Sequence, residues 1–120
     1  MNADDLARLR RCRLFRDVDQ RLLGELLSRF ACRIRSYPAD RLIHTRGEAY
    51  RNLLVLLEGS VSAEMHDLAG RTLHVETIAA PQAVASAVLF APENLLPVSI
   101  RAAREVRLLS LPAEAVLALC

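Results

Sequence analysis

The sequence lacks the long apolar segment and the leader that would direct a protein to a membrane or out of the cell. Its 120 residues contain no uninterrupted apolar run of 18 or more, which is close to the length that a helix needs to cross a bilayer. A charged and then apolar leader with a small-residue cleavage site is also missing. We therefore expect a soluble, cytoplasmic protein with no membrane partner.

Cysteine is scarce, and its pattern excludes two common roles. Cys12, Cys32 and Cys120 are odd in number, far apart and without a Cys-x-x-Cys pair. Neither a disulfide framework nor a zinc site is therefore indicated. We expect these residues to act as small apolar side chains in a reducing cytosol.

Lysine is absent, so all sixteen basic residues are arginine, and they are unevenly placed. Residues 1–51 carry twelve arginines against seven acidic residues (+5), whereas residues 52–120 carry four against seven (−3). This asymmetry permits an acidic partner surface but does not require one. The N-terminal arginines have no interleaved aromatic residues, which favours a solvated helix face over a nucleic-acid contact. They are Arg8, Arg10, Arg11, Arg13 and Arg16.

Catalytic motifs are missing as well. The sequence contains no Gly-x-Ser-x-Gly elbow and no glycine-rich phosphate loop. His44, His66 and His74 form no His-x-His pair, and Glu64 and Glu76 complete no metal-ligand spacing with them. We therefore expect no enzyme, no catalytic residue and no metal site.

What the sequence does have, at 52% apolar, is enough hydrophobic material for one domain with its own core. Two N-terminal helices are predicted, the first capped by Asp4 or Asp5 and the second by Asp17 or Asp19. Between them, Leu14–Phe15 is predicted to be a buried apolar plug. The second helix carries apolar residues at helical spacing, namely Val18, Leu22, Leu23, Leu26, Leu27 and Phe30.

From residue 32 onward, short runs bounded by turn residues replace the helical pattern. Their spacing of roughly 8–12 residues predicts an antiparallel sandwich or barrel. Residues 61–65 and 73–75 alternate, which indicates half-buried strands joined through a turn at Gly70, and Leu53–Leu57 should be an interior strand. The predicted strands are Cys32–Tyr37, Arg41–Thr45, Asn52–Leu57, Ser60–His66, Thr72–Ile78, Val98–Ala103 and Glu105–Leu111.

Four segments of the chain carry a family pattern, namely Ser36–Glu48, Leu53–Val61, Ala85–Phe90 and Pro97–Ala102. They resemble parts of the cyclic-nucleotide-binding domains of the cyclic-AMP receptor protein and FNR-type regulators. Ser36–Glu48 resembles their aromatic-x-x-Gly-x-x-Ile-x-x-x-Gly-Glu segment, with Asp40, which tolerates a left-handed turn, at the first Gly. Leu53–Val61 resembles their Tyr-x-Ile-x-Ser-Gly-x-Val strand and turn. Ala85–Phe90 and Pro97–Ala102 have the layout of the two halves of their phosphate-binding cassette. The resemblance covers nearly the whole chain, and NO- and redox-responsive Crp/Fnr members are the most similar.

The resemblance implies a mainly β fold, a double-stranded β-helix (jelly-roll) barrel with two N-terminal helices, a short cassette helix and the start of a C-terminal helix. One sensor domain is expected over residues 1–120. The helices would occupy residues 1–31, the β-roll 32–111, and the start of the C-terminal helix 112–120. The resemblance further implies a homodimer of the full-length protein, which would bind DNA only through a C-terminal domain absent from this sequence.

The cassette keeps its layout but not its binding residues. With Ala102 aligned to the terminal Ala of the family pattern, Ser86 stands at the Glu that grips the ribose and Leu96 at the Arg that grips the cyclic phosphate. Pro81 and Ala85 stand at glycines that let backbone N–H groups approach a phosphate. Losing the guanidinium–phosphate contact alone costs on the order of 2–5 kcal/mol. We therefore expect a sensor that does not bind cyclic AMP.

Three hypotheses remain for the effector. The first is haem that senses a gas or a redox signal, with His74 and Met65 as candidate axial ligands, since some members of the superfamily bind haem in this pocket. The second is an apolar small molecule, and the third is an unliganded barrel that serves dimerisation or partner docking. An iron–sulfur cluster is disfavoured because it needs four thiolates. The candidate pocket residues are Val84, Ser86, Val88, Leu89, Leu96, Val98 and Ser99.

Overall fold

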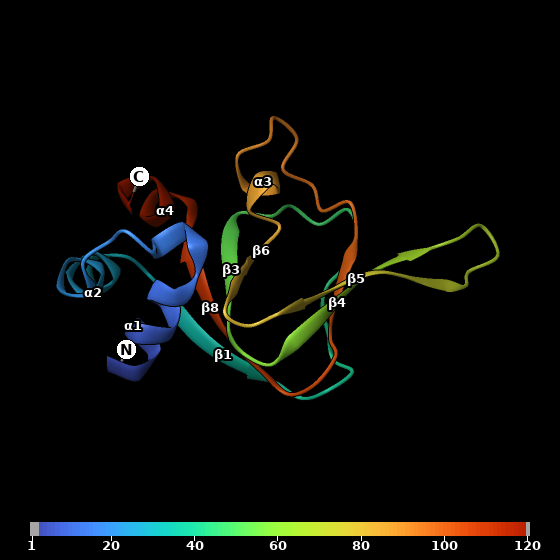
Figure 1. Cartoon of the computed structure of the whole chain (residues 1–120). Coiled ribbons are helices and arrows are strands. Elements are labelled where there is room, and N and C mark those ends of the chain that lie inside the picture. The colour runs from blue at the N-terminus through green and yellow to red at the C-terminus, as the bar shows by residue number, and fades with distance from the viewer. Residues whose placement is uncertain (1–2, 120) are drawn as a thin grey trace.

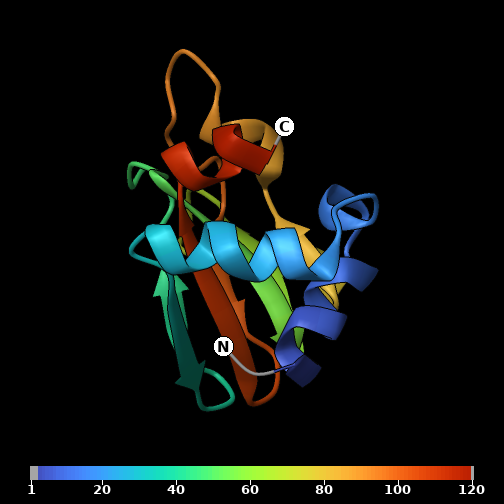
Figure 2. The ribbon, with the colours of Figure 1, turned by 90° about the vertical axis from the view of Figure 1, so that its left-hand side faces the viewer.

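Two four-stranded antiparallel sheets face each other, and three of the helices, α1, α2 and α4, lie over the outer side of one sheet (Figures 1 and 2). The computed structural model describes residues 3–119. The helices are α1 (Ala3–Arg11), the 3₁₀ turn η1 (Arg13–Phe15), α2 (Gln20–Arg29), α3 (Ser86–Leu89) and α4 (Ala113–Leu119). The strands are β1 (Arg33–Tyr37), β2 (Leu42–His44), β3 (Asn52–Glu58), β4 (Ser60–His66), β5 (Thr72–Ala79), β6 (Gln82–Val84), β7 (Ser99–Ala102) and β8 (Val106–Pro112).

The strand order confirms the predicted mainly β jelly-roll. The first sheet runs β1-β8-β3-β6 and the second runs β2-β7-β4-β5. The chain therefore crosses between the sheets from β1 to β2 at one edge and from β5 to β6 at the other. Each of the seven predicted strands is present to within two residues at either end, and β6 is an additional strand that sequence reasoning missed.

Strand β3 is the centre of the core. Side chains of a strand alternate between its two faces, and the helices cover one face of the first sheet while the second sheet covers the other. All five residues of Leu53–Leu57 are consequently at most 7% exposed. This burial confirms the interior strand that the uninterrupted apolar run predicts.

Helix α2 begins at one of its two predicted caps. The Asp19 carboxylate accepts a hydrogen bond from the Arg21 N–H at 3.4 Å. Leu23 and Leu27 are buried beneath the helix, as predicted. Leu22, by contrast, is 49% exposed, because a helix packed on one sheet buries only a stripe narrower than its apolar face.

The β4–β5 hairpin extends beyond the sandwich, as Figure 1 shows at its right-hand side. Its predicted turn is confirmed, with Gly70 at φ +81°. The alternation predicts that Leu73 and Val75 lie on the buried face of the hairpin, and this is wrong. Both side chains are about half exposed, because the facing sheet does not reach them. The predicted plug between the helices is likewise half right, since Phe15 is fully buried and Leu14 is 41% exposed.

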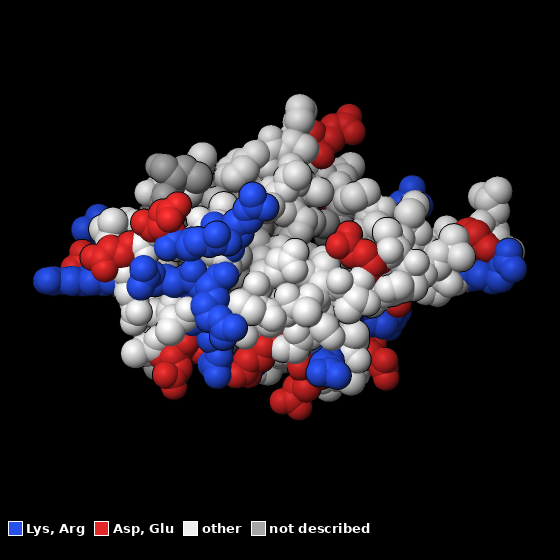
Figure 3. All heavy atoms as spheres, viewed as in Figure 1, with Lys and Arg blue, Asp and Glu red and all other residues white. Residues whose placement is uncertain are grey.

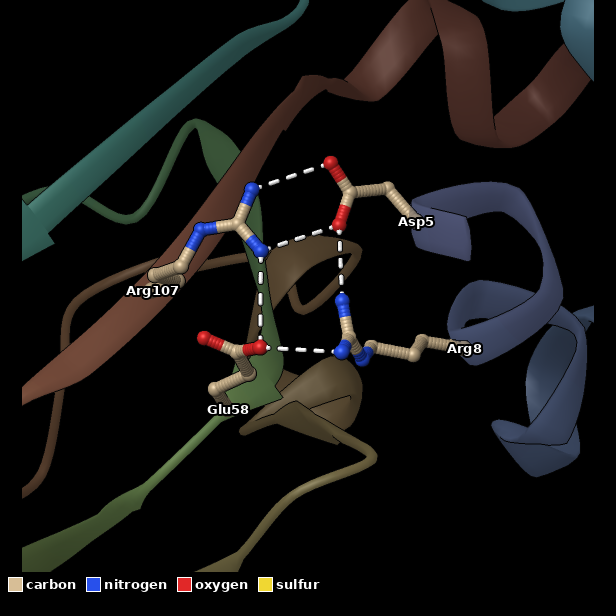
Figure 4. Close-up of polar contacts among 4 residues, drawn as sticks. All are labelled: Asp5, Arg8, Glu58 and Arg107. Atoms are coloured by element: carbon tan, nitrogen blue, oxygen red, sulfur yellow. Dashed lines mark hydrogen bonds and ion pairs between the residues drawn. The ribbon is translucent and has the colours of Figure 1, made fainter. Parts of the chain in front are cut away.

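An ion-pair cluster around the buried carboxylate of Asp5 fastens α1 to the first sheet (Figure 4). Arg107 donates one hydrogen bond to each carboxylate oxygen of Asp5, both at 2.9 Å, and Arg8 donates a third at 3.2 Å. Glu58 pairs with Arg8 at 3.1 Å and lies 3.7 Å from Arg107. The hydrogen bond from Arg107 is the main cause that lowers the pKa of Asp5 below its ordinary value. Two arginines thus meet two carboxylates, and residues 102 positions apart are joined.

Candidate functional site

The predicted cassette keeps a special backbone conformation at its start. Ala85 lies between β6 and α3 with φ +52° and ψ +43°, in the left-handed region that glycine adopts freely and other residues rarely occupy. Asp40 also has a positive φ, +70°, in agreement with its predicted turn. Ala85 therefore has the backbone conformation expected of the glycine that the sequence resemblance places at this position.

Most of the candidate pocket residues are packed into the core. Val84, Leu89 and Leu96 are at most 5% exposed and belong to one hydrophobic cluster, and Val88 and Val98 pack against that cluster. Ser86 does not join them, since it lies exposed at the first position of α3. Five of the seven predicted residues are therefore part of the hydrophobic core or pack directly against it.

The backbone of Leu96 forms hydrogen bonds through both its N–H and its carbonyl group. Its N–H donates to the Glu48 carbonyl at 3.0 Å, and its carbonyl accepts from the Gly47 N–H at 2.8 Å. The side chain is 1% exposed. A fully buried apolar group therefore occupies the position that the sequence resemblance assigns to a phosphate-gripping arginine.

The seventh candidate, Ser99, has a partner within the chain. It is 2% exposed, and its Oγ accepts a hydrogen bond from the Arg46 N–H at 3.0 Å. In the same turn, Glu48 accepts from the Thr45 N–H at 3.0 Å and lies 2.7 Å from Nδ1 of His44. These two contacts, chiefly the one with His44, lower the pKa of Glu48. The turn at residues 45–48 is thus fixed against β7.

Tyr50 is a buried polar residue that sequence reasoning missed. Its hydroxyl donates to the carbonyl of Val84 and accepts from the Leu54 N–H at 2.9 Å. Burial raises the pKa of this phenol to about 12, so it stays protonated as a donor at neutral pH. Tyr50 therefore connects the loop before β3 to the residue that immediately precedes the cassette.

His74 lies on the surface of the β4–β5 hairpin. Both of its ring nitrogens have hydroxyl partners, Ser62 Oγ at 2.7 Å from Nδ1 and Thr77 Oγ1 at 3.1 Å from Nε2. Coordination of a haem iron by His74 would break one of these hydrogen bonds. This placement does not fit an axial ligand directed into the roll.

Met65, the other candidate haem ligand, is on the opposite face of the hairpin. It pairs with Leu73, whereas the adjacent pair joins Glu64 to His74, and neighbouring pairs in a ladder point to opposite faces. Met65 is half-buried and continues the strand face of the buried Val61. The two candidates therefore do not face each other across one site, and haem ligation stays a prediction.

Figure 3 shows a cluster of basic side chains over the region where Figure 1 labels α1. Arg11, Arg13 and Arg16 are exposed, whereas Arg8 belongs to the ion-pair cluster with Asp5. Within residues 3–119, no group of three or more His, Cys, Asp or Glu residues is arranged to hold a metal ion. No helix in this described range is long and apolar enough to span a membrane.

The family model for the cyclic nucleotide-binding domain matches residues 34–120, and no curated protein matches the chain. Because the model spans more than half of the sequence, the chain belongs to the cyclic nucleotide-binding domain family. Among its members, the resemblance to the sensor domains of Crp/Fnr-type regulators is confirmed by the fold.

Three solved structures illustrate this similarity. A transcriptional regulator from Thermotoga maritima is 28% identical with a TM-score of 0.72, over 81% of this chain and 74% of that protein. The sensor domain of the regulator DNR from Pseudomonas aeruginosa is 18% identical with a TM-score of 0.83, over 99% of this chain and 79% of that one. The regulatory domain of Toxoplasma gondii PKA, solved with cyclic AMP, is 16% identical with a TM-score of 0.80, over 97% and 43% respectively.

Proposed function

We propose that this chain is the effector-sensing domain of a Crp/Fnr-type transcription regulator whose cassette does not bind cyclic AMP. The observation that carries the proposal is the full burial of Leu96 at the position of the phosphate-gripping arginine. Ala85 retains the left-handed backbone of the cassette. The cassette therefore keeps its backbone conformation but lacks the charged side chain that would bind a phosphate.

Electrostatics supports this proposal. A cyclic nucleotide carries a negative charge that must leave water when it enters the cassette, and burying such a charge without a partner is costly. The segment Val84–Leu89 contains no charged side chain, and its one hydroxyl, on Ser86, is exposed. The replacement of glycine by Pro81 also removes a backbone N–H donor.

Isothermal titration calorimetry with cyclic AMP tests the proposal. We expect no binding heat up to about 1 mM nucleotide, which corresponds to a binding free energy weaker than about 4 kcal/mol. The Toxoplasma PKA regulatory domain, whose solved structure holds cyclic AMP, is the positive control on the same fold. Saturable micromolar binding to this chain would contradict the proposal.

Native mass spectrometry of the chain from a haem-replete host separates the remaining effector hypotheses. An added haem mass that disappears in Met65→Ala and persists in His74→Ala would support haem sensing through Met65. A bare mass would exclude a resident haem. The third hypothesis, a ligand-free module for dimerisation or docking, is favoured only if no small molecule is found to bind.

The proposed output runs through α4, which directly follows β8. Ala115 and Val116 of α4 are buried against the core of the roll. An effector that binds one of two orientations of this helix more tightly shifts the equilibrium between them. In a full-length homodimer, this shift would alter the DNA contacts of a separate C-terminal domain.

A further inference from the structure

A cavity of about 530 Å³ opens to solvent at the edge of the first sheet formed by β1, where its lining residues Arg33, Arg35 and Arg51 are exposed. The cassette follows β6, which forms the other edge of that sheet. Strands β1, β3 and β8 of the first sheet and β2 of the second line the cavity. Its volume is in the range of small-molecule sites in proteins. The cavity is therefore distinct from the cassette.

Two arginines of β1 share the face that lines this cavity. Arg33 pairs with Ser110 and Arg35 pairs with Leu108, and all four residues line it. Alternate residues of a strand lie about 7 Å apart on the same side. The intervening Ile34 points to the other face, where it lines a hollow beneath α1 and α2.

The cavity carries positive charge without a matching acid. Arg33, Arg35 and Arg51 line it, and no Asp or Glu is among its lining residues. None of the three forms an ion pair with any residue in the described range 3–119. Three like charges around one space repel one another, so an anion between them is favoured. The nearby Glu48 is already engaged by His44 and by the Thr45 N–H.

The rest of the lining combines an apolar body with uncharged polar groups. Ile43, Leu54 and Leu108 supply aliphatic surface, and Tyr37 and Tyr50 supply aromatic rings. The side chains of Asn52 and Ser110 add hydrogen-bonding groups. A pocket that combines apolar surface with convergent polar and charged groups suits an organic ligand better than a bare inorganic ion.

We propose that this cavity binds a small organic dianion, with two acidic groups on a planar apolar body held by Arg33, Arg35 and Arg51. This inference rests on the proposed function, because it takes the dianion to be the effector of the sensing domain and the cavity to be its binding site. Tyr50 lines the cavity and donates its hydroxyl to Val84, next to the cassette. A ligand beside Tyr50 thus contacts a side chain that reaches the cassette directly.

A titration with phthalate, followed by NMR of the backbone amides and arginine Nε–H groups, tests this site. We expect saturable shifts at Arg33, Arg35 and Arg51, with a dissociation constant near 1 mM, as is usual for a fragment of about twelve heavy atoms. Phthalamide, the neutral analogue, should bind at least about tenfold more weakly. Arg35→Gln should weaken phthalate by about tenfold. Arg16→Gln removes an exposed charge just after η1 and should change the affinity less than twofold.

Three outcomes would overturn the assignment: equal binding of phthalamide, equal weakening by Arg16→Gln, or no saturable shift at the three cavity arginines. The thermal midpoint of each variant shows that a lost affinity does not reflect a lost fold. Cyclic AMP binding at the cassette would contradict the proposed function while leaving this titration interpretable. The two failures are therefore distinguishable.

Discussion

Arginines on the two faces of the first sheet meet opposite environments. On the helix-covered face, Arg107 donates two hydrogen bonds to Asp5, and the cluster around it balances two positive charges with two negative ones. On the face that lines the cavity, Arg33 and Arg35 of the adjacent strand have no acidic partner among the described residues. One set of guanidinium groups holds the fold together, and the other is available to a ligand.

The largest expected effect on stability comes from replacing Arg107, the arginine that has acidic partners. Arg107→Gln should destabilise the domain by about 3–4 kcal/mol, because the buried carboxylate of Asp5 loses its bidentate partner and keeps only Arg8. Urea unfolding followed by circular dichroism measures this loss. An unfolding free energy equal to that of the wild-type chain would remove the distinction between the two faces.

The cassette provides the next largest effect. Leu96→Arg restores the residue type of a cyclic-AMP site but places a charge where the side chain is 1% exposed, so it should cost about 3 kcal/mol. Leu96→Met, which conserves volume, should cost less than about 1.5 kcal/mol. A stable Leu96→Arg variant that binds cyclic AMP would show that Leu96 alone prevents nucleotide binding and that the other cassette changes do not.

The pH dependence of stability sharpens the role of Asp5. Because hydrogen bonding lowers its folded pKa below 3.8, its contribution is present above the unfolded pKa and is lost as the pH falls through the folded pKa. Asp5→Asn should therefore cost about 2 kcal/mol at neutral pH, and its stability should converge with that of the wild-type chain in acid. Asp4→Asn, at the exposed neighbour, is the control and should change little at any pH. Parallel pH profiles for the wild-type chain and Asp5→Asn would refute this role.

The smallest expected effect on stability comes from replacing Arg35, an arginine of the cavity that has no acidic partner among the described residues. Arg35→Gln should change the unfolding free energy by no more than about 0.5 kcal/mol without ligand, because no ion pair within the described residues is lost. Thermal unfolding at low ionic strength measures the difference. A loss similar to that of Arg107→Gln would mean that Arg35 holds the fold and is not free for an anion.

Local signals in the sequence account for most of the fold. Short runs bounded by turn residues located the strands, and Asp19 is a cap that the sequence predicts. Strand β6, only three residues long, gave no detectable period. The exposure of Leu22, Leu73 and Val75 also escaped prediction, because periodicity shows which residues share a face but not how far the neighbouring layer extends.

The candidate sites, like the fold, could be predicted only in part from the sequence. The altered cassette was visible at Ser86 and Leu96 because a resemblance supplied the alignment. The alternation of Arg33 and Arg35 is present in the sequence, yet only their pairing with β8 places them on the cavity side. The partnership of Asp5 with Arg107 spans 102 residues, a separation that no local pattern encodes.

The most direct test of the central claim is one amide NMR experiment in which cyclic AMP and then phthalate are added to the same sample. We expect the amides of Ala85–Leu89 to stay unchanged with cyclic AMP and those of Arg33, Arg35 and Arg51 to shift with phthalate. Saturable cassette shifts with cyclic AMP and silence at the arginines would contradict the claim.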